Sequence, residues 1–270
     1  MANGEKIKMI NQTFTLTYGD VCENHVGMEQ IGTLCSSGIS IETLQNVVTM
    51  YPQNATLYHL NTEEYHPPAA ILVIKGGIEL LLGSGGTQNL FAEHWALEKD
   101  TKAFMRGRVV NKIARHNLCF SDVGHGPEYE KGIGTVIPFA NVPWTWALRH
   151  QLGIIFDQPQ LQCEGNYYYD VTSDKVGIGR HGDTERRIVI GARMGASLPL
   201  EFYWYYKTKP ISPPMRFNLD HGDIYVMSDK AVGYDWKRSS IVTLRHAAGS
   251  DRFLAKENAR VEALIRKREE

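Results

Sequence analysis

The segment EGNYYYDV (residues 164–171) and the segments after it decide the fold class. It is short, aromatic and bounded by turn-forming residues, as expected of a β-strand. Similar β-branched and aromatic runs recur at strand-and-turn intervals, which is typical of an antiparallel sandwich or barrel. We therefore expect a mostly β fold with flanking helices (α+β). The other runs are GTVIPF (134–139), RRIVIGARM (186–194), LEFYWYY (200–206), MRFNL (215–219), DIYVMS (223–228) and SIVTLRHA (240–247).

Helical patterns lie outside these runs. PWTWALRHQLGIIF (143–156) places apolar residues near a 3.6-residue period, and the tail after Ser250 is a charged amphipathic helix. The first hundred residues are mixed, with a strand, a glycine-rich connection and a partly helical stretch. We expect an N-terminal extension of unclear role over residues 1–100, a core domain over 101–250 and a C-terminal helix over 251–270.

Composition narrows the class of protein. The chain has 270 residues, of which 43% are apolar, as in an ordinary globular protein. Its 29 basic residues are balanced by 30 acidic ones, so it has no global basic excess of the kind that favours nucleic-acid binding. No apolar run reaches the length of a membrane span, and the N-terminal MANGEKIKMINQ lacks an apolar signal core. Four widely spaced cysteines form no CxxC pair. We expect an intracellular protein, cytoplasmic or nuclear, with reduced thiols and no membrane partner.

The tripeptide HGD occurs twice, at residues 181–183 and 221–223. A histidine and a carboxylate two residues apart on an extended chain can point the same way and share one metal ion. Two imidazoles and one carboxylate on a β scaffold leave positions open for a co-substrate and dioxygen. Either copy is therefore a candidate metal-binding pair.

From about Arg106 to Gly249 the sequence resembles the AlkB-like family of Fe(II)/2-oxoglutarate dioxygenases. The resemblance covers more than half of the chain and implies a double-stranded β-helix (jelly-roll) core, with Fe(II) as the metal and 2-oxoglutarate as co-substrate. The matching segments follow in family order: ARHNLCFSD (114–122), IPFANVPWTWALRHQL (137–152), GNYYYD (165–170), RHGDTE (180–185), LDHGDIYVM (219–227) and IVTLR (241–245).

The resemblance assigns roles to particular residues. It implies that His181 and Asp183 bind the metal, whereas the second HGD is a structural turn in which Asp223 bonds to backbone. Asn166 and Tyr168, which share one face of a strand, would hydrogen-bond 2-oxoglutarate. Two further residues complete the set: Arg245 would pair with the distal carboxylate of 2-oxoglutarate, and Glu185 would contact the substrate base.

The third metal ligand departs from the family pattern. The segment KAVGYDWKRSS (230–240), where the family carries its second histidine, has none. Asp235 takes that place in chain order and is our first expectation. His246 is the alternative. Because it is adjacent to Arg245, the two side chains point to opposite faces of a regular strand, and both could face the site only through a bulge. A site without a third ligand is the remaining possibility.

The function implied is oxidation of a C–H bond, on an N-methyl or base methyl group, in a modified base of DNA or RNA. Such a base is read outside its stack, where aromatic side chains support it. Two other classes stay open: an oxygenase acting on a protein side chain or small molecule, and a non-catalytic AlkB-fold binding protein with a degraded metal site. The candidate substrate residues are Tyr203, Trp204 and Trp236, with basic help from Arg106, Arg108, Lys112 and Arg115.

Overall fold

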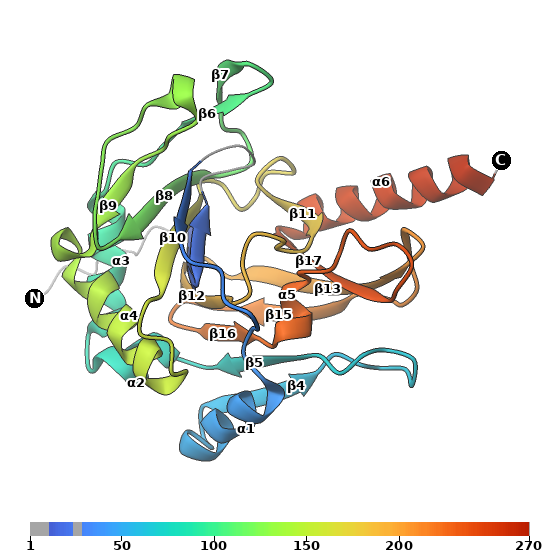
Figure 1. The fold of residues 1–270 in the computed structure, drawn as a ribbon, viewed down its shortest axis with the longest axis horizontal. Helices are drawn as coiled ribbons and strands as arrows, with labels where there is room; N and C mark the ends of the chain where they lie inside the picture. The colour runs from blue at the N-terminus through green and yellow to red at the C-terminus, as the bar shows by residue number, and fades with distance from the viewer. Residues whose placement is uncertain (1–10, 24–28, 270) are drawn as a thin grey trace, which may run out of the picture.

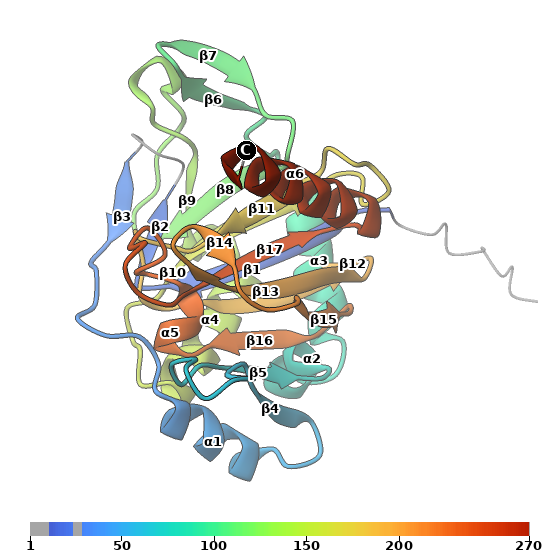
Figure 2. The same ribbon diagram turned by 90° about the vertical axis from the view of Figure 1, so that its right-hand side faces the viewer.

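The computed structural model describes residues 11–23 and 29–269, and the larger of its two main sheets has eight strands (Figures 1 and 2). All neighbours in this sheet are antiparallel except the parallel pair β8–β9. Their order across the sheet is β4 (Ala55–His59), β5 (Ala70–Ile74), β16 (Ile224–Met227), β12 (Ile190–Gly195), β1 (Thr13–Gly19), β10 (Gln162–Tyr168), β8 (His116–Ser121) and β9 (Val136–Pro138).

The second main sheet has five strands, with β13 at a branch point. The sheets give a mostly β fold with a few helices, as the aromatic runs predict. Strands β11 (Gly177–His181), β17 (Thr243–Gly249), β13 (Leu198–Tyr206) and β14 (Lys209–Pro210) follow in that order, and β15 (Met215–Leu219) also pairs with β13. Two small ribbons pair β2 (Val21–Glu23) with β3 (Gln30–Gly32) and β6 (Lys102–Met105) with β7 (Arg108–Asn111).

Alternation along the strands of the large sheet builds two hydrophobic cores. In β5, Leu72 and Ile74 join the core under the helices, whereas Ile71 and Val73 join the core shared with the five-stranded sheet. The same period of two holds in the other strands of the sheet, because successive side chains point to opposite faces. In β1, β10 and β12, the face turned toward the second sheet carries polar side chains. A cavity lies there.

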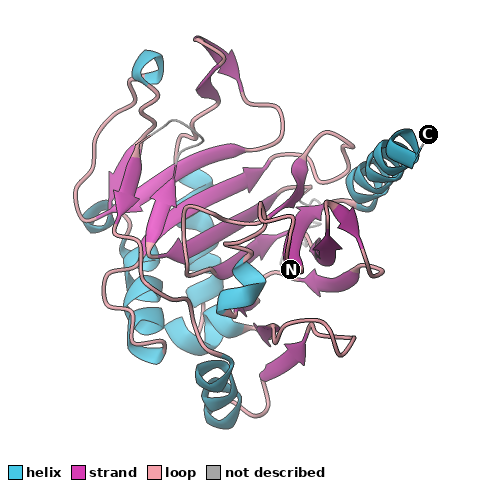
Figure 3. Ribbon diagram, turned by 45° about the vertical axis from the view of Figure 1, so that its right-hand side comes forward, coloured by secondary structure: helices cyan, strands magenta, loops and turns pink. Residues whose placement is uncertain are grey.

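Helices cover the outer face of the large sheet (Figure 3). Their apolar residues, such as Leu44, Leu90 and Leu148, complete the outer core. Pro143 begins the long helix α4, and the Glu93 carboxylate accepts hydrogen bonds from the first backbone N–H groups of that helix. The helices are α1 (Ile41–Met50), α2 (Gly77–Leu82), α3 (Gly86–Ala96) and α4 (Pro143–Ile155).

The remaining helices lie near the five-stranded sheet. The short α5 (Asp229–Val232) contributes Ala231 and Val232 to the core between the sheets. Helix α6 (Asp251–Glu269) follows β17, packs its first turns through Phe253 and Leu254, and extends away from the body (Figure 1). In the described part of the chain, no helix has the length and apolarity needed to cross a membrane.

The expected division at residue 100 does not appear in the sheet. Strand β1 lies between β10 and β12, and β5 lies between β4 and β16, so the first hundred residues form part of the main sheet. Long-range pairing of this kind leaves no local signal in the sequence, and for this reason the early strands read as an extension. The helix expected from residue 251 is present.

Candidate metal centre

Three potential ligand side chains meet between β11 and β17. His181 ends β11, Asp183 follows two residues later, and His246 lies in β17; one ligand atom from each lies within 4.8 Å of the others. Asp183 is central, with His181 Nε2 3.5 Å from Oδ1 and His246 Nε2 3.9 Å from Oδ2. The cluster is a candidate metal site with two imidazoles and one carboxylate.

The local backbone explains this convergence. Strands β11 and β17 are antiparallel with His181 opposite His246, and the register shifts between Ile178 and His181. Such a bulge re-aims the side chains beside it. Gly182 packs so closely on the loop after α5 that an added Cβ would lie 2.3 Å from the Gly233 carbonyl oxygen. The glycine of this HGD is therefore required by close backbone approach.

Hydrogen bonding and burial prepare the three side chains for a cation. His181 Nδ1 lies 2.8 Å from the Gly179 carbonyl oxygen, so its N–H donates there and Nε2 is left as an acceptor. Burial, followed by the neighbouring His181, lowers the pKa of His246 to about 3. Burial alone would raise the pKa of Asp183, but His246 and Arg186 hold it below its usual value. Neutral imidazoles and an ionised carboxylate are the forms that bind metal.

His246, and not Asp235, completes the cluster. Asp235 lies in the loop after α5, where its Oδ2 accepts a hydrogen bond from Lys230 Nζ at 2.6 Å. It lines a separate hollow with Arg187 and Tyr234. The first expectation for the third ligand is thus corrected to the alternative. The reason is that a short helix and a loop occupy the segment where chain order suggested a strand.

Arg245 faces away from the cluster. On a strand its side chain points opposite to that of its neighbour His246. Its guanidinium carbon lies 3.8 Å from the ring centroid of Tyr205 and 5.0 Å from that of Trp236, and Arg245 is not among the residues that line the cavity. The expected role of Arg245 at a distal carboxylate is therefore not supported by its position.

The cluster opens into a cavity of about 280 Å³ between the two sheets. Asn166 and Tyr168 line it from β10, as their alternate positions predict. Asn166 Oδ1 accepts hydrogen bonds from Arg115 Nε and, at 2.9 Å, from Asn117 Nδ2. This leaves the Asn166 amide N–H groups available to a ligand.

The eight-stranded sheet forms the cavity wall that faces the metal cluster. Apart from Asn166 and Tyr168, most residues of this wall were not predicted from the sequence. Thr15 in β1 and Arg193 in β12 are cross-strand partners, and both line the cavity. Alternation in TFTLTYG (13–19) was the available signal, since its threonines occupy every second position. An arginine among the buried residues of IGARMG (190–195) was another. Neither segment belongs to a recognisable motif.

A buried ion pair lies deeper in this wall. Glu164 accepts hydrogen bonds from Arg186 Nη2 at 2.7 Å and from Asn117 Nδ2 at 2.9 Å. Glu185 also lines the cavity, where burial and the nearby Asp183 raise its pKa. The cavity is also lined by four cationic side chains, which are those of Arg115, Arg186, Arg193 and Lys237. They outnumber the three carboxyl groups of Glu164, Asp183 and Glu185, so a bound divalent ion would make the cavity strongly positive.

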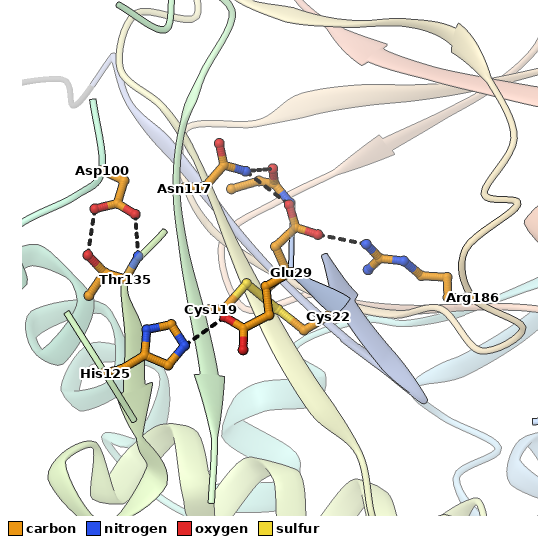
Figure 4. The surroundings of a disulfide bond; sticks show 10 residues. Cys22, Glu29, Asp100, Asn117, Cys119, His125, Thr135 and Arg186 are labelled. Atoms are coloured by element: carbon orange, nitrogen blue, oxygen red, sulfur yellow. Dashed lines mark hydrogen bonds and ion pairs between the residues drawn. A yellow bond between two sulfur atoms is a disulfide. The ribbon is translucent and has the colours of Figure 1, made fainter. Parts of the chain in front are cut away.

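A disulfide adjoins this wall (Figure 4). Cys22 of β2 is bonded to Cys119 of β8. Cys119 lies two residues from Asn117, on the same face of the strand, and is the cross-strand partner of Glu164. The expectation of four reduced thiols is therefore not met for this pair. A separation of 97 residues hid the pairing from the sequence. Cys35 and Cys163 are free.

The aromatic candidates differ in their accessibility. Trp204 is fully buried: its Nε1 donates to the Leu60 carbonyl oxygen at 2.7 Å, and its ring stacks on His66. Tyr203 is buried under Arg180 and next to α6. Neither can stack on a ligand, because alternate residues of this strand pack into the cores on both faces. Trp236 does line the cavity.

The second HGD forms the expected structural turn. Asp223 is buried and accepts hydrogen bonds from the backbone N–H groups of Gly76 and Asp220 and from Lys75 Nζ at 2.6 Å. His221 Nδ1 accepts a hydrogen bond from the Gly195 N–H.

Of the basic candidates, Arg106 and Arg108 lie at the β6–β7 hairpin, and Arg115 reaches the cavity.

Comparison with known proteins finds a similar viral protein. The chain is 44% identical over 254 residues to the "Uncharacterized protein R156" of Acanthamoeba polyphaga mimivirus, and the match covers 91% of this chain and 98% of the viral protein. A search against family models finds no match. The chain belongs to the same family as this mimivirus protein.

Proposed function

We propose that this chain is an AlkB-like, Fe(II)- and 2-oxoglutarate-dependent dioxygenase that oxidises a methyl group on a nucleobase. The observation that carries the proposal is the meeting of His181, Asp183 and His246 at the edge of a cavity. In this proposal the two main sheets, which share a core, form the two halves of a double-stranded β-helix.

The donor set fits the metal. Two imidazoles and one carboxylate on one side of an ion are the arrangement that non-haem Fe(II) oxygenases use, and the remaining positions stay open. His181 and His246 bring Nε2 toward Asp183, and the local environment favours their metal-binding protonation states. When bound, Fe(II) and 2-oxoglutarate would supply the oxidising chemistry.

The chain's own residues would hold the co-substrate and exclude water. The Asn166 amide can donate hydrogen bonds to a carboxylate, while Arg115 and Asn117 hold its carbonyl oxygen in place. Tyr168 is buried and its pKa is raised, first by that burial, so its hydroxyl remains a neutral donor. Side chains from both sheets line the cavity, and a bound ligand would displace water from it.

The substrate would enter past Trp236, Lys237 and Glu185. Trp236 offers an aromatic surface to a base taken out of its stack, and Lys237 offers a cation for a phosphate. Glu185 places its carboxyl group in the same part of the cavity, where it can hydrogen-bond to polar atoms of a base.

Turnover assays test the proposal. The protein is incubated aerobically with Fe(II), 2-oxoglutarate and a single-stranded oligonucleotide carrying an N-methylated base, and succinate and demethylated base are quantified. We expect both products from the wild type and from Asp235→Ala, and neither from Asp183→Ala or His246→Ala. Succinate without change in any oligonucleotide would redirect the proposal to another substrate class. Absence of succinate from metal-loaded, folded protein would refute it.

A further inference from the structure

Arg193 is a buried cation without a carboxylate partner among the described residues. Its side chain is 1% exposed, yet neither Nε nor Nη1 has a hydrogen-bond partner among the described residues. No carboxylate of the described chain lies within ion-pairing distance of it, and the ring centroid of Tyr225 is 6.0 Å from the guanidinium carbon. A buried charge in this state is costly to the fold, so a ligand anion is the expected partner.

A second unsatisfied group lies directly beside it. Thr15 faces Arg193 across the β1–β12 pair, is 4% exposed, and its Oγ1 also has no hydrogen-bond partner among the described residues. Both side chains line the cavity that contains His181 and His246. A guanidinium fork next to a hydroxyl matches the geometry and donor needs of a carboxylate.

The position of this pair defines the ligand. Arg193 and Thr15 belong to the eight-stranded sheet, whereas the metal cluster belongs to the five-stranded sheet, so the two sites occupy different walls of one cavity. One small molecule that reaches both needs a chelating end and a second anionic end. The cavity of about 280 Å³ suits a compact organic acid.

We infer that Arg193 and Thr15 bind the distal carboxylate of a dicarboxylic 2-oxo acid whose other end faces the metal cluster. The inference rests on the proposed function. It assigns the carboxylate-binding arginine to Arg193 on β12 instead of Arg245, which stacks on Tyr205 outside the cavity. The polar contacts would be donated by the Arg193 Nε and Nη1 groups and by the Thr15 hydroxyl.

The test compares two acids that differ only in the distal carboxylate. Protein loaded with Mn(II), an oxidation-resistant substitute for Fe(II), is titrated calorimetrically with 2-oxoglutarate and with 2-oxopentanoate. We expect the wild type to bind 2-oxoglutarate on the order of 100-fold more tightly. Arg193→Met should abolish this preference and Thr15→Val should reduce it about tenfold. Arg245→Met, the matched control, should retain it.

Melting temperatures of Arg193 variants distinguish a role in binding the carboxylate from a purely structural role. Arg193 has no ion-pair partner in the described part of the chain, so Arg193→Met should have an unchanged or higher melting temperature in the absence of acid. The variant should also lose the thermal shift that 2-oxoglutarate gives the wild type. Arg193→Lys, which keeps the charge, serves as the second variant. Full preference in folded Arg193→Met would overturn the anchor and leave the proposed function intact. If Mn(II)-loaded wild type bound neither acid, both would be overturned.

Discussion

Stability at acidic pH should depend on His94, which supports the site strand β10 from behind. The ring is fully buried, with Nδ1 2.7 Å from the Tyr167 hydroxyl and Nε2 2.7 Å from the Thr145 hydroxyl. Tyr167 lies between Asn166 and Tyr168, both of which line the cavity. Burial, with a smaller effect of Lys99, lowers the pKa of His94 to about 3.

The sign and size of the effect follow from proton linkage. An unfolded chain protonates this histidine below about pH 6.5, whereas the folded chain does so only near pH 3, so acid favours unfolding. Each pH unit below 6.5 removes about 1.4 kcal/mol of unfolding free energy until the folded pKa is reached. Between pH 7.5 and pH 5.0, His94 alone should therefore remove about 2 kcal/mol.

Urea unfolding of the wild type and His94→Gln, followed by circular dichroism at both pH values, measures this contribution. At pH 7.5 the variant should be about 1–3 kcal/mol less stable, because the Tyr167 and Thr145 hydroxyl groups lose their hydrogen bonds to the imidazole ring. At pH 5.0 that deficit should shrink by about 2 kcal/mol, since glutamine has no proton to gain. The exposed His150→Gln is the control and should show no such change. An equal deficit at both pH values would refute the reasoning.

Three further predictions concern the core, the disulfide and the metal-site turn. Trp204→Ala should lower the unfolding free energy by about 3–5 kcal/mol, because the ring is fully buried; stable protein with weakened substrate binding would contradict this. Cys22→Ser should lower it by about 4–5 kcal/mol relative to the oxidised wild type, because the bond to Cys119 spans 97 residues; equal urea midpoints would contradict this. Gly182→Ala should weaken Mn(II) binding at least tenfold, because its Cβ would lie 2.3 Å from a carbonyl oxygen. Gly126→Ala, with open space around it, should bind as the wild type does.

The strands of the second half were predictable because each carries its own signal. Aromatic and β-branched runs between turns mark β10, β12, β13 and β17, and each run lies at an observed strand. The HGD at residues 181–183 marked two members of the cluster for the same reason, since its residues are adjacent in the chain. Local pattern was sufficient there.

Features that depend on distant pairing were not predictable in this way. The third member of the cluster follows from the β11–β17 register, which sets His246 opposite His181. Chain order instead suggested Asp235, which pairs with Lys230. Likewise, Thr15 becomes part of the cavity only through its pairing with β12, about 180 residues later in the chain. No local pattern encodes such neighbours.

The identity of the third ligand is the central claim, and metal affinity tests it most directly. Binding of Mn(II) at pH 7.5 is measured from the loss of the free-ion electron paramagnetic resonance signal, for the wild type, His246→Ala and Asp235→Ala. We expect one ion per wild-type chain, affinity at least about tenfold weaker in His246→Ala, and wild-type affinity in Asp235→Ala. Wild-type affinity in His246→Ala together with lost binding in Asp235→Ala would contradict the account.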